Sequence, residues 1–286
     1  MIHDTHQPEA AGQDEPQAAE AQGRYLLAVH EALTRLLEDG DSPGWKRVRS
    51  SKSALVAQTT QAPFFYAKIF FPRRWYEGVK TLFRGDRAYR TDWRTHALRS
   101  AGFSAPAVVL RGRVANLPFV ITEAAPGMSL AKYLDQRARV PRLAGQPLAD
   151  WRAALRSLGR EIGRLHQAGF FHTELRTSNI QIESRPQGAA RFSFIDNEGT
   201  RRFRHIPRWR RVKNLAQLNM DHLHISRTDR MRVFGAYLDA MGQGHARNQL
   251  AWEIHQRTQR RLMENASRRA ADGSQRSDRN AASIRP

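Results

Sequence analysis

The stretch FFHTELRTSNIQI, Phe170–Ile182, places four polar side chains between apolar flanks. His172 is followed by an acid at Glu174, a base at Arg176 and an amide at Asn179. A carboxylate in such a loop can orient and deprotonate a hydroxyl group. An arginine beside it can neutralise a phosphate group during transfer. The stretch is therefore predicted to be a catalytic loop.

A second acid follows the next apolar segment of the chain. FSFID, Phe192–Asp196, is predicted to be a strand that ends at Asp196. An Asn and an Asp at the ends of adjacent strands can hold Mg²⁺ through oxygen ligands, so Asn179 and Asp196 are the predicted metal ligands. Taken singly, His172 also fits a core histidine, Asn179 a turn former and Asp196 a strand-end cap. The combination of these residues in one order favours the catalytic interpretation.

One lysine lies inside the most apolar predicted strand, FFYAKIFF, Phe64–Phe71. The charge of Lys68 must either meet an anion or reach solvent, because an unpaired buried charge is costly. An edge lysine that extends to water is the alternative interpretation. Asp92, on a helix predicted for Gly85–Ala101, is a candidate partner for Lys68.

The predicted elements change from mainly strands in the first half to mainly helices in the second. The helix at Gly85–Ala101 is expected to bury a face made of Tyr89, Trp93, Ala97 and Leu98. The fold class is α+β, with a small β-rich lobe followed by a helical lobe. The predicted divisions are a disordered leader at 1–24, an N-lobe at 25–124, a C-lobe at 125–265 and a disordered basic tail at 266–286.

Composition indicates an anionic partner. The 286-residue chain has a net charge of +20, with 47 basic residues against 27 acidic ones, and no cysteine, which excludes disulfides and thiolate metal sites. Two basic and aromatic stretches, Arg201–Leu215 and Phe70–Arg84, are predicted to contact an anionic acceptor or acidic lipid. No signal peptide or spanning helix is expected, so a cytoplasmic protein peripheral to the membrane is predicted.

Several segments resemble landmarks of one family. LHQAGFFHTELRTSNI, Leu165–Ile180, resembles the LHxxGxxHxDLxxxNI loop of small kinases. FSFIDNEGTRRF, Phe192–Phe203, resembles the strand end of bacterial lipopolysaccharide core kinases, the Kdo/WaaP family with its InaA-like members. YAKIF, RTDWR, LRSAGFSAP and FVITEAAPGMSLAKYL are similar to further landmarks in the same order. Over roughly Trp45–Met241 the resemblance implies a two-lobed protein-kinase-like fold.

The resemblance also implies a nucleotide site in the first half of the chain. Lys68 would hold the α- and β-phosphates of ATP, steadied by Asp92. Glu123 and Ala124 would lie at the hinge that receives the adenine. The segment that would cover the phosphates is RSSKSALVAQ, residues 49–58. It contains no glycine.

In the second half, the resemblance implies the catalytic roles. Glu174 would be the base, Arg176 would contact the γ-phosphate, and His172 would brace the loop. Asn179 and Asp196 would hold Mg²⁺. Glu174 departs from the usual Asp by one methylene, and Asp92 is one methylene shorter than the usual helix Glu.

The implied function is an ATP-dependent kinase that phosphorylates Kdo or heptose in the lipopolysaccharide inner core. The implied partners are a lipid A–core glycolipid and the anionic inner leaflet. The departures also fit a catalytically impaired pseudokinase. A protein Ser/Thr kinase, which the missing D-F-G and A-P-E landmarks disfavour, and a small-molecule phosphotransferase are further candidates. A nucleic-acid binder fits the charge, but no recognition motif supports it.

Overall fold

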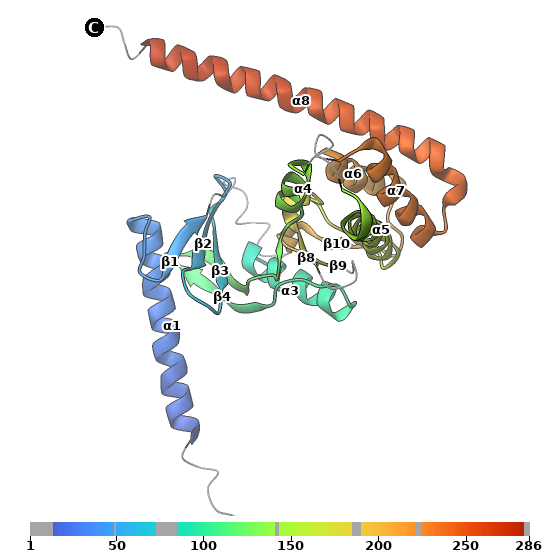
Figure 1. Cartoon of the computed structure of the whole chain (residues 1–286). Coiled ribbons are helices and arrows are strands. Elements are labelled where there is room, and N and C mark those ends of the chain that lie inside the picture. Colours follow the sequence, from blue (N-terminus) through green and yellow to red (C-terminus); the bar gives the residue numbers. More distant parts are fainter. Residues whose placement is uncertain are drawn as a thin grey trace, which may run out of the picture. The chain divides into compact units, whose positions relative to one another are not determined.

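The computed structural model describes residues 14–48, 50–72, 85–140, 143–184, 190–220 and 225–282 (Figure 1). The chain divides into two compact units. The first unit comprises Met1–Ala88 and Val108–Glu123, and the second comprises Tyr89–Ala107 and Ala124–Pro286.

The first unit is built on an antiparallel five-stranded sheet in the order β1-β2-β3-β5-β4. Its strands are β1 (Trp45–Val48), β2 (Ala54–Thr59), β3 (Phe65–Phe70), β4 (Val108–Val114) and β5 (Leu117–Glu123). Helix α1 (Asp14–Glu38) lies beside this sheet (Figure 1). Leu33 and Leu36 of α1 are fully buried in one core cluster with Ile69 and Ile121 of the sheet. Burial of this helix face against the strands forms the core of the unit.

Strand β3 shows the alternation of a strand that is buried on both faces. Ala67 and Ile69 face the cluster that includes α1, whereas Phe70 belongs to a second cluster with Val120. Lys68 therefore lies on the face of Phe70, and its Nζ is 5.2 Å from the centre of that ring. Because β3 lies between β2 and β5, Lys68 is not on an edge strand.

The second unit packs helices around two small sheets. Its helices are α3 (Arg87–Ser100, from Tyr89 onward), α4 (Leu130–Ala138), α5 (Gly145–Gln167), α6 (Arg208–Leu218), α7 (Arg227–Met241) and α8 (Arg247–Ala282). One sheet has the order β6-β8-β9, from Met128–Ser129, Ile180–Ser184 and Ala190–Phe194. The other pairs β7 (Phe170–Phe171) with β10 (Arg201–Arg202).

Helices α5 and α7 pack closely because α5 has glycines at the contact. A Cβ atom at Gly159 would lie 2.1 Å from the carbonyl oxygen of Val233, and one at Gly163 would lie 2.5 Å from Cβ of Ala240. The absence of side chains at these two positions lets the helix backbones approach. This close packing against α7 fixes the end of α5, which leads into β7.

Three expectations differ from the structure. Helix α1 begins at Asp14, inside the predicted disordered leader, and α8 continues to Ala282 through the predicted disordered tail. The part of α1 within the leader contains Ala, Gln and Glu, and the tail contains Ala and Arg, and the high helix propensity of these residues outweighs their polarity. On α3, Tyr89 and Trp93 are 45% and 59% exposed, whereas Thr91, Thr95 and Leu98 are buried. The lobe boundaries at 124 and 265 stay predictions.

Two further expectations concern membranes. None of the helices in the described ranges combines the length and apolar character needed to cross a bilayer. Most of the predicted lipid-contacting stretch Phe70–Arg84 lies outside the described residues, since 73–84 are not among them.

Candidate active site

The predicted catalytic loop joins β7 to β8, and buried residues alternate in it with exposed charged ones. Leu175 is fully buried and Thr177 is 1% exposed, while Glu174 and Arg176 are exposed. A short 3₁₀ turn, Thr177–Asn179, leads into β8. The alternation fixes the loop to the core through its apolar side chains and presents the carboxylate of Glu174 to solvent.

Two buried amides on α6 hold the backbone on either side of Glu174. Asn214 donates from Nδ2 to the carbonyl oxygen of His172 at 2.5 Å, and Gln217 donates from Nε2 to that of Thr173 at 2.9 Å. The Leu175 amide donates to Oε1 of Gln217 at 3.3 Å. Buried polar groups are stable only when paired, so these bonds fix the position of the loop.

Sequence reasoning missed both amides. They occur three residues apart in the segment KNLAQL, Lys213–Leu218, and are 0% and 2% exposed. The sequence does carry a signal for them: two amides lie at this spacing on the apolar face of a predicted helix. Such buried amides need polar partners inside the core.

Replacing Asn214 with alanine is expected to lower the free energy of unfolding by about 3 kcal/mol. The change leaves the carbonyl oxygen of His172 and Nε2 of His166, 3.2 Å from Oδ1 of Asn214, without their amide partner. Urea unfolding measures the loss. Gln256→Ala, an exposed amide on α8, is the control and should unfold like the unchanged protein. Equal stability of both variants would contradict the bracing role of Asn214.

His172 connects the loop to the segment before Asp196. Its Nε2 is 3.0 Å from the carbonyl oxygen of Ile195. Burial lowers the pKa of His172, although the bond to Ile195 and the charge of Asp196 act in the opposite direction. The ring is therefore neutral at pH 7, and Nε2–H donates to Ile195. His172 acts here through position, since it is 1% exposed and does not reach solvent.

A second buried histidine makes stability depend on pH. Burial is the main reason that the pKa of His166 falls from 6.5 to about 4. The unfolded chain binds this proton below pH 6.5, while the native protein binds it only below about pH 4. The stabilisation is therefore complete above pH 6.5 and is lost as the pH falls towards 4, by about 3 kcal/mol.

We expect urea midpoints to fall between pH 7.5 and pH 5 by more in the unchanged protein than in His166→Phe. His245→Gln removes an exposed histidine and should leave the pH dependence as it is. The same slope in His166→Phe and in the unchanged protein would show that another group is responsible.

Asn179 and Asp196 lie at the same end of one strand pair. Strand β8 pairs with β9 through Ile180 and Phe194, and the Ile195 amide donates to the carbonyl oxygen of Asn179 at 3.0 Å. The positions before Ile180 and after Phe194 are thus adjacent. The strand register, fixed by backbone bonds, brings both predicted metal ligands to this end.

The amide of Asn179 is oriented by a bond inside the loop. Its Nδ2 donates to the carbonyl oxygen of Glu174 at 2.9 Å, which leaves Oδ1 as the atom that can face a cation. Asp196 is exposed and has a left-handed backbone, with φ 59° and ψ 48°. Asp and Asn tolerate this conformation better than most residues.

This donor set fits Mg²⁺. One amide oxygen and one carboxylate are oxygen ligands of the kind that Mg²⁺ takes, alongside water and substrate phosphates. Within the described ranges there is no cluster of three or more His, Asp or Glu side chains that could hold a metal. Two oxygen ligands suit Mg²⁺ because it commonly completes its coordination with water and substrate phosphates.

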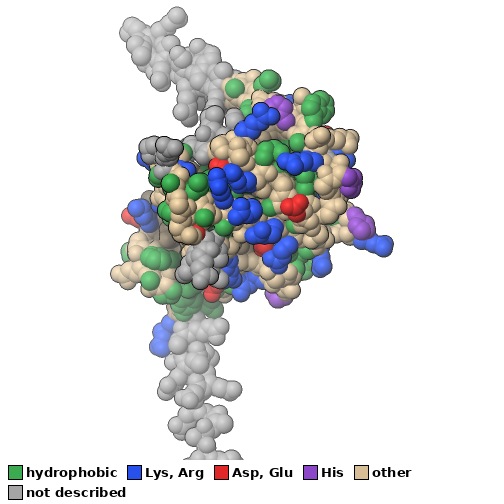
Figure 2. Space-filling view, turned by 45° about the vertical axis from the view of Figure 1, so that its right-hand side comes forward, with side chains coloured by type: hydrophobic (Ala, Val, Ile, Leu, Met, Phe, Trp, Pro, Cys, Tyr) green, Lys and Arg blue, Asp and Glu red, His purple; other side chains and the backbone are tan. Residues whose placement is uncertain are grey.

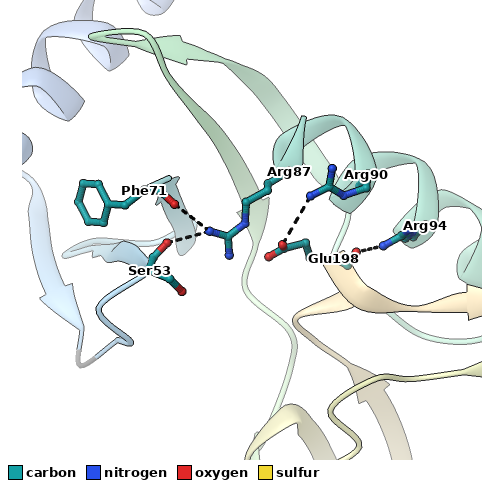
Figure 3. A network of polar contacts seen from close by, with 6 residues as sticks. All are labelled: Ser53, Phe71, Arg87, Arg90, Arg94 and Glu198. Carbon is teal, nitrogen blue, oxygen red and sulfur yellow. Dashed lines mark hydrogen bonds and ion pairs between the residues drawn. The ribbon is translucent and has the colours of Figure 1, made fainter. Parts of the chain in front are cut away.

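Helix α3 fixes the turn that follows Asp196. Arg90 lies 3.9 Å from the carboxylate of Glu198, and Arg94 donates to the backbone carbonyl oxygen of the same residue (Figure 3). Asn197 is buried and donates from Nδ2 to Phe194 at 2.9 Å. These contacts hold the 3₁₀ turn Asn197–Gly199. Sequence reasoning missed them, because the arginines are more than a hundred positions from their partner.

The same helix begins with an arginine that belongs to the first unit. Arg87 donates to the carbonyl oxygens of Ser53 at 2.9 Å and Phe71 at 3.2 Å (Figure 3). It is only 7% exposed, and its guanidinium lies 4.6 Å from the ring of Phe70. The bonds link the residue before β2 to the residue after β3, beside Phe70, which lies on the same face of β3 as Lys68.

The predicted nucleotide-binding residues are distributed over both units. Lys68 and Glu123 lie in the first, on β3 and at the end of β5, where Glu123 is the strand partner of Phe65. Asp92, half-buried on α3, and Ala124 lie in the second, with the catalytic loop. Within the second unit the structure brings together His172, Glu174, Asn179 and Asp196. Convergence with Lys68 stays a prediction.

The basic stretch Arg201–Leu215 is not one uniform surface. Arg208 pairs with Glu253 of α8 at 2.9 Å. The guanidinium of Arg210 lies 4.6 Å from the ring of Phe203 and 4.5 Å from that of Trp209. Part of the stretch thus serves packing, which the sequence alone did not indicate.

The second unit also contains an apolar cavity of about 570 Å³. It touches the catalytic loop only at Thr177. Its walls come from helices α4 to α8 and from residues that follow α6, including Leu130, Leu134, Leu215, Ile225, Phe234 and Ile254. None of the predicted site residues lines this cavity.

Comparison with known proteins decides the family. A family model for the "Lipopolysaccharide kinase (Kdo/WaaP) family" matches residues 87–237, more than half of the chain. The chain belongs to this family. The match includes the catalytic loop, Asn179 and Asp196, whereas Lys68 precedes it. Membership of the lipopolysaccharide kinase family confirms the predicted resemblance and the predicted class of enzyme, a kinase-type phosphotransferase.

The solved structure of WaaP confirms the fold of this lipopolysaccharide kinase family member. WaaP, solved in complex with acyl carrier protein, is 19% identical, with a TM-score of 0.54 over 79% of this chain and 95% of WaaP. The likeness confirms the predicted two-lobed, kinase-like fold. A crystal structure of WbdD matches 75% of this chain and 50% of that one, at 18% identity and a TM-score of 0.46.

A curated relative matches by sequence. The O-antigen chain terminator bifunctional methyltransferase/kinase WbdD of Escherichia coli is 26% identical over 172 residues, which are 56% of this chain and 22% of WbdD. The match thus spans about a fifth of the length of WbdD.

Proposed function

We propose that the protein is an ATP-dependent kinase that phosphorylates a sugar hydroxyl, of Kdo or heptose, in the lipopolysaccharide inner core. The observation that carries the proposal is the arrangement of Glu174, Asn179 and Asp196. An exposed carboxylate lies on a loop held by α6, and two oxygen ligands lie at the adjacent strand end. This arrangement supports phosphoryl transfer to an alcohol.

Glu174 holds the acceptor hydroxyl and accepts its proton as the sugar oxygen bonds to the γ-phosphorus of ATP. The bond from that phosphorus to the β-phosphate oxygen breaks, and ADP leaves. Arg176, exposed two residues later, neutralises charge on the transferred group. Lys68 would hold the remaining phosphates. Mg²⁺, when bound by Asn179 and Asp196, would offset phosphate charge and orient the chain of phosphates.

Bracing by α6 serves this chemistry. Catalysis by a positioned base depends on geometry, and a displacement of about 1 Å can cost about 100-fold in rate. Three backbone groups around Glu174 are fixed by Asn214 and Gln217. The longer side chain of Glu174 therefore starts from a fixed backbone.

The acceptor is proposed to be a lipid-linked glycan, the lipid A–core, at the cytoplasmic face of the inner membrane. The net charge of +20 supports approach to an acidic leaflet. Arg201, Arg202 and Arg204 are exposed beside the catalytic loop, since β10 pairs with β7.

The test is transfer of phosphate from ATP to purified lipid A–core in the presence of Mg²⁺, followed by mass spectrometry of the glycolipid. The expected result is the gain of one phosphate on Kdo or heptose. Nucleotide binding without transfer would favour the pseudokinase instead. Transfer to a protein or small metabolite, with none to the glycolipid, would overturn the proposed acceptor.

A further inference from the structure

We propose that Lys213, Arg257 and Arg261 form a binding site for a phosphate group of the acceptor, next to Glu174. The inference deepens the proposed function and rests on it for the identity of the acceptor. It assigns substrate-recognition roles to three residues on α6 and α8 that neither the loop motif nor the metal pair includes.

Lys213 lies on the side of α6 that faces the catalytic loop. The residue after it, Asn214, bonds to the backbone of His172. The Nζ atom of Lys213 lies 5.4 Å from the ring centre of Phe171, in the strand that enters the loop. Its ammonium group is thus held close to the loop residues, and the side chain is half-buried.

Helix α8 carries two arginines where it packs against the part of α6 that holds Lys213. The pair Arg208–Glu253, at 2.9 Å, and the bond from Nδ2 of Asn219 to Oγ1 of Thr258, at 3.2 Å, join the two helices on either side of this lysine. Arg257 and Arg261 are four residues apart, so they lie on one face of the helix. Ile254 and Thr258 bury the neighbouring face. The position of these arginines relative to α6 is therefore fixed by packing and by an ion pair.

The cluster has an excess of positive charge. Burial lowers the pKa of Lys213, and the charges of Arg261, Arg257 and Arg210 lower it further, whereas Glu174 raises it. Among the described side chains, no carboxylate forms an ion pair with Lys213, Arg257 or Arg261. Several like charges held together with only one opposite charge nearby cost free energy that a bound anion would offset.

The chemistry of the ligand follows from these charges. Lys213, Arg257 and Arg261, with Arg210 nearby, outnumber the one carboxylate of Glu174, so the excess of positive charge suits an anionic phosphate. Arginine binds phosphate oxygens through two parallel bonds, and lysine adds a point charge. Because Lys213 lies beside Phe171, three positions before Glu174, a phosphate bound here would lie near the hydroxyl that Glu174 holds. Figure 2 shows that Lys and Arg gather on one face with few acids.

Binding is measured without catalysis by ¹³C reductive methylation of the six lysines and NMR titration with inorganic phosphate. The resonance of Lys213, assigned with Lys213→Arg, is expected to titrate below the exposed lysines and to shift on addition of phosphate. Arg257→Gln/Arg261→Gln should move its titration upward and abolish the phosphate response. Arg260→Gln, an exposed neighbour on α8, is the matched control and should leave both unchanged.

A titration of Lys213 like that of the exposed lysines, or no response beyond that to sodium chloride of equal ionic strength, would overturn the site. Vesicles of phosphatidylglycerol distinguish a lipid headgroup from the acceptor. A response to vesicles but not to inorganic phosphate would make the cluster a membrane contact and overturn the proposal.

Steady-state kinetics separates this inference from the proposed function. Lys213→Gln and Arg257→Gln/Arg261→Gln are expected to raise KM for the glycolipid at least tenfold, with KM for ATP unchanged. If the unchanged protein transfers no phosphate but Lys213 still responds to phosphate, the kinase proposal fails and the site stands. Phosphate transfer with unchanged KM for the glycolipid in both variants would overturn the phosphate site and leave the kinase proposal standing.

Discussion

Replacing Glu174 with glutamine is expected to lower kcat for phosphate transfer by about 10²–10⁴-fold. Glutamine keeps the size of the side chain and can contact the acceptor hydroxyl, but it cannot accept the proton. The backbone should not move, because the loop is held by Asn214 and Gln217 rather than by the carboxylate. Single-turnover transfer to the glycolipid measures the loss.

The aspartate variant is the matched control for this position. Glu174→Asp keeps the charge and withdraws the carboxylate by about 1 Å, so a loss of up to about 100-fold, at the low end of the range for glutamine, is expected. Affinity for ATP should be equal in all three proteins. Full activity in Glu174→Gln would show that another group is the base, and the role of this loop would have to be abandoned.

The second large effect is expected for Asp196→Asn, which should lower kcat by about 10²–10³-fold. The change removes one negative charge from a pair of oxygen ligands whose other member, Asn179, is neutral. The variant should also need a higher Mg²⁺ concentration for half-maximal activity, because carboxylates bind Mg²⁺ more tightly than amides. A Mg²⁺ titration of the initial rate measures both quantities.

Glu198→Gln gives the comparison for the metal ligand. Glu198 lies two residues after Asp196, and its carboxylate is 3.9 Å from Arg90 on α3. Its loss should reduce kcat modestly without changing the Mg²⁺ requirement. An unchanged Mg²⁺ requirement in Asp196→Asn would exclude Asp196 as a ligand.

Much of the fold followed from local patterns. The aromatic and β-branched residues of Phe64–Phe71 correctly predict the buried strand that carries Lys68, because side chains on both faces of β3 are buried. Ser129 shows the other local signal, a serine directly before a helix, and it caps α4 by accepting a bond from the Lys132 amide at 3.2 Å. Such features depend on neighbours within a few residues, which a sequence shows directly.

The failures have a common cause. On α3, Thr95 is buried and Trp93 is exposed, because Thr95 meets the amide of Asn197, about a hundred positions away. The roles of Asn214 and Gln217 likewise depend on carbonyl groups more than forty positions away. A hydrophobic pattern cannot show a polar residue that is buried because its partner is distant. For the candidate site, spacing predicted the residues that carry the chemistry but not those that hold them.

Gly199 determines how the two halves of the candidate site are spaced. A Cβ atom at this position would lie 1.8 Å from Oγ1 of Thr173, so the turn after Asp196 touches the residue before Glu174 directly. The distance between the Glu174 and Asp196 segments is therefore fixed by direct contact between the backbone of Gly199 and the side chain of Thr173. A longer acid at 174 must be accommodated by rotation of its own side chain, since the loop cannot slide away from the turn. A change in the length of the acid at position 174 thus leaves the backbone in place. Any side chain at position 199 would instead force the turn after Asp196 away from the catalytic loop.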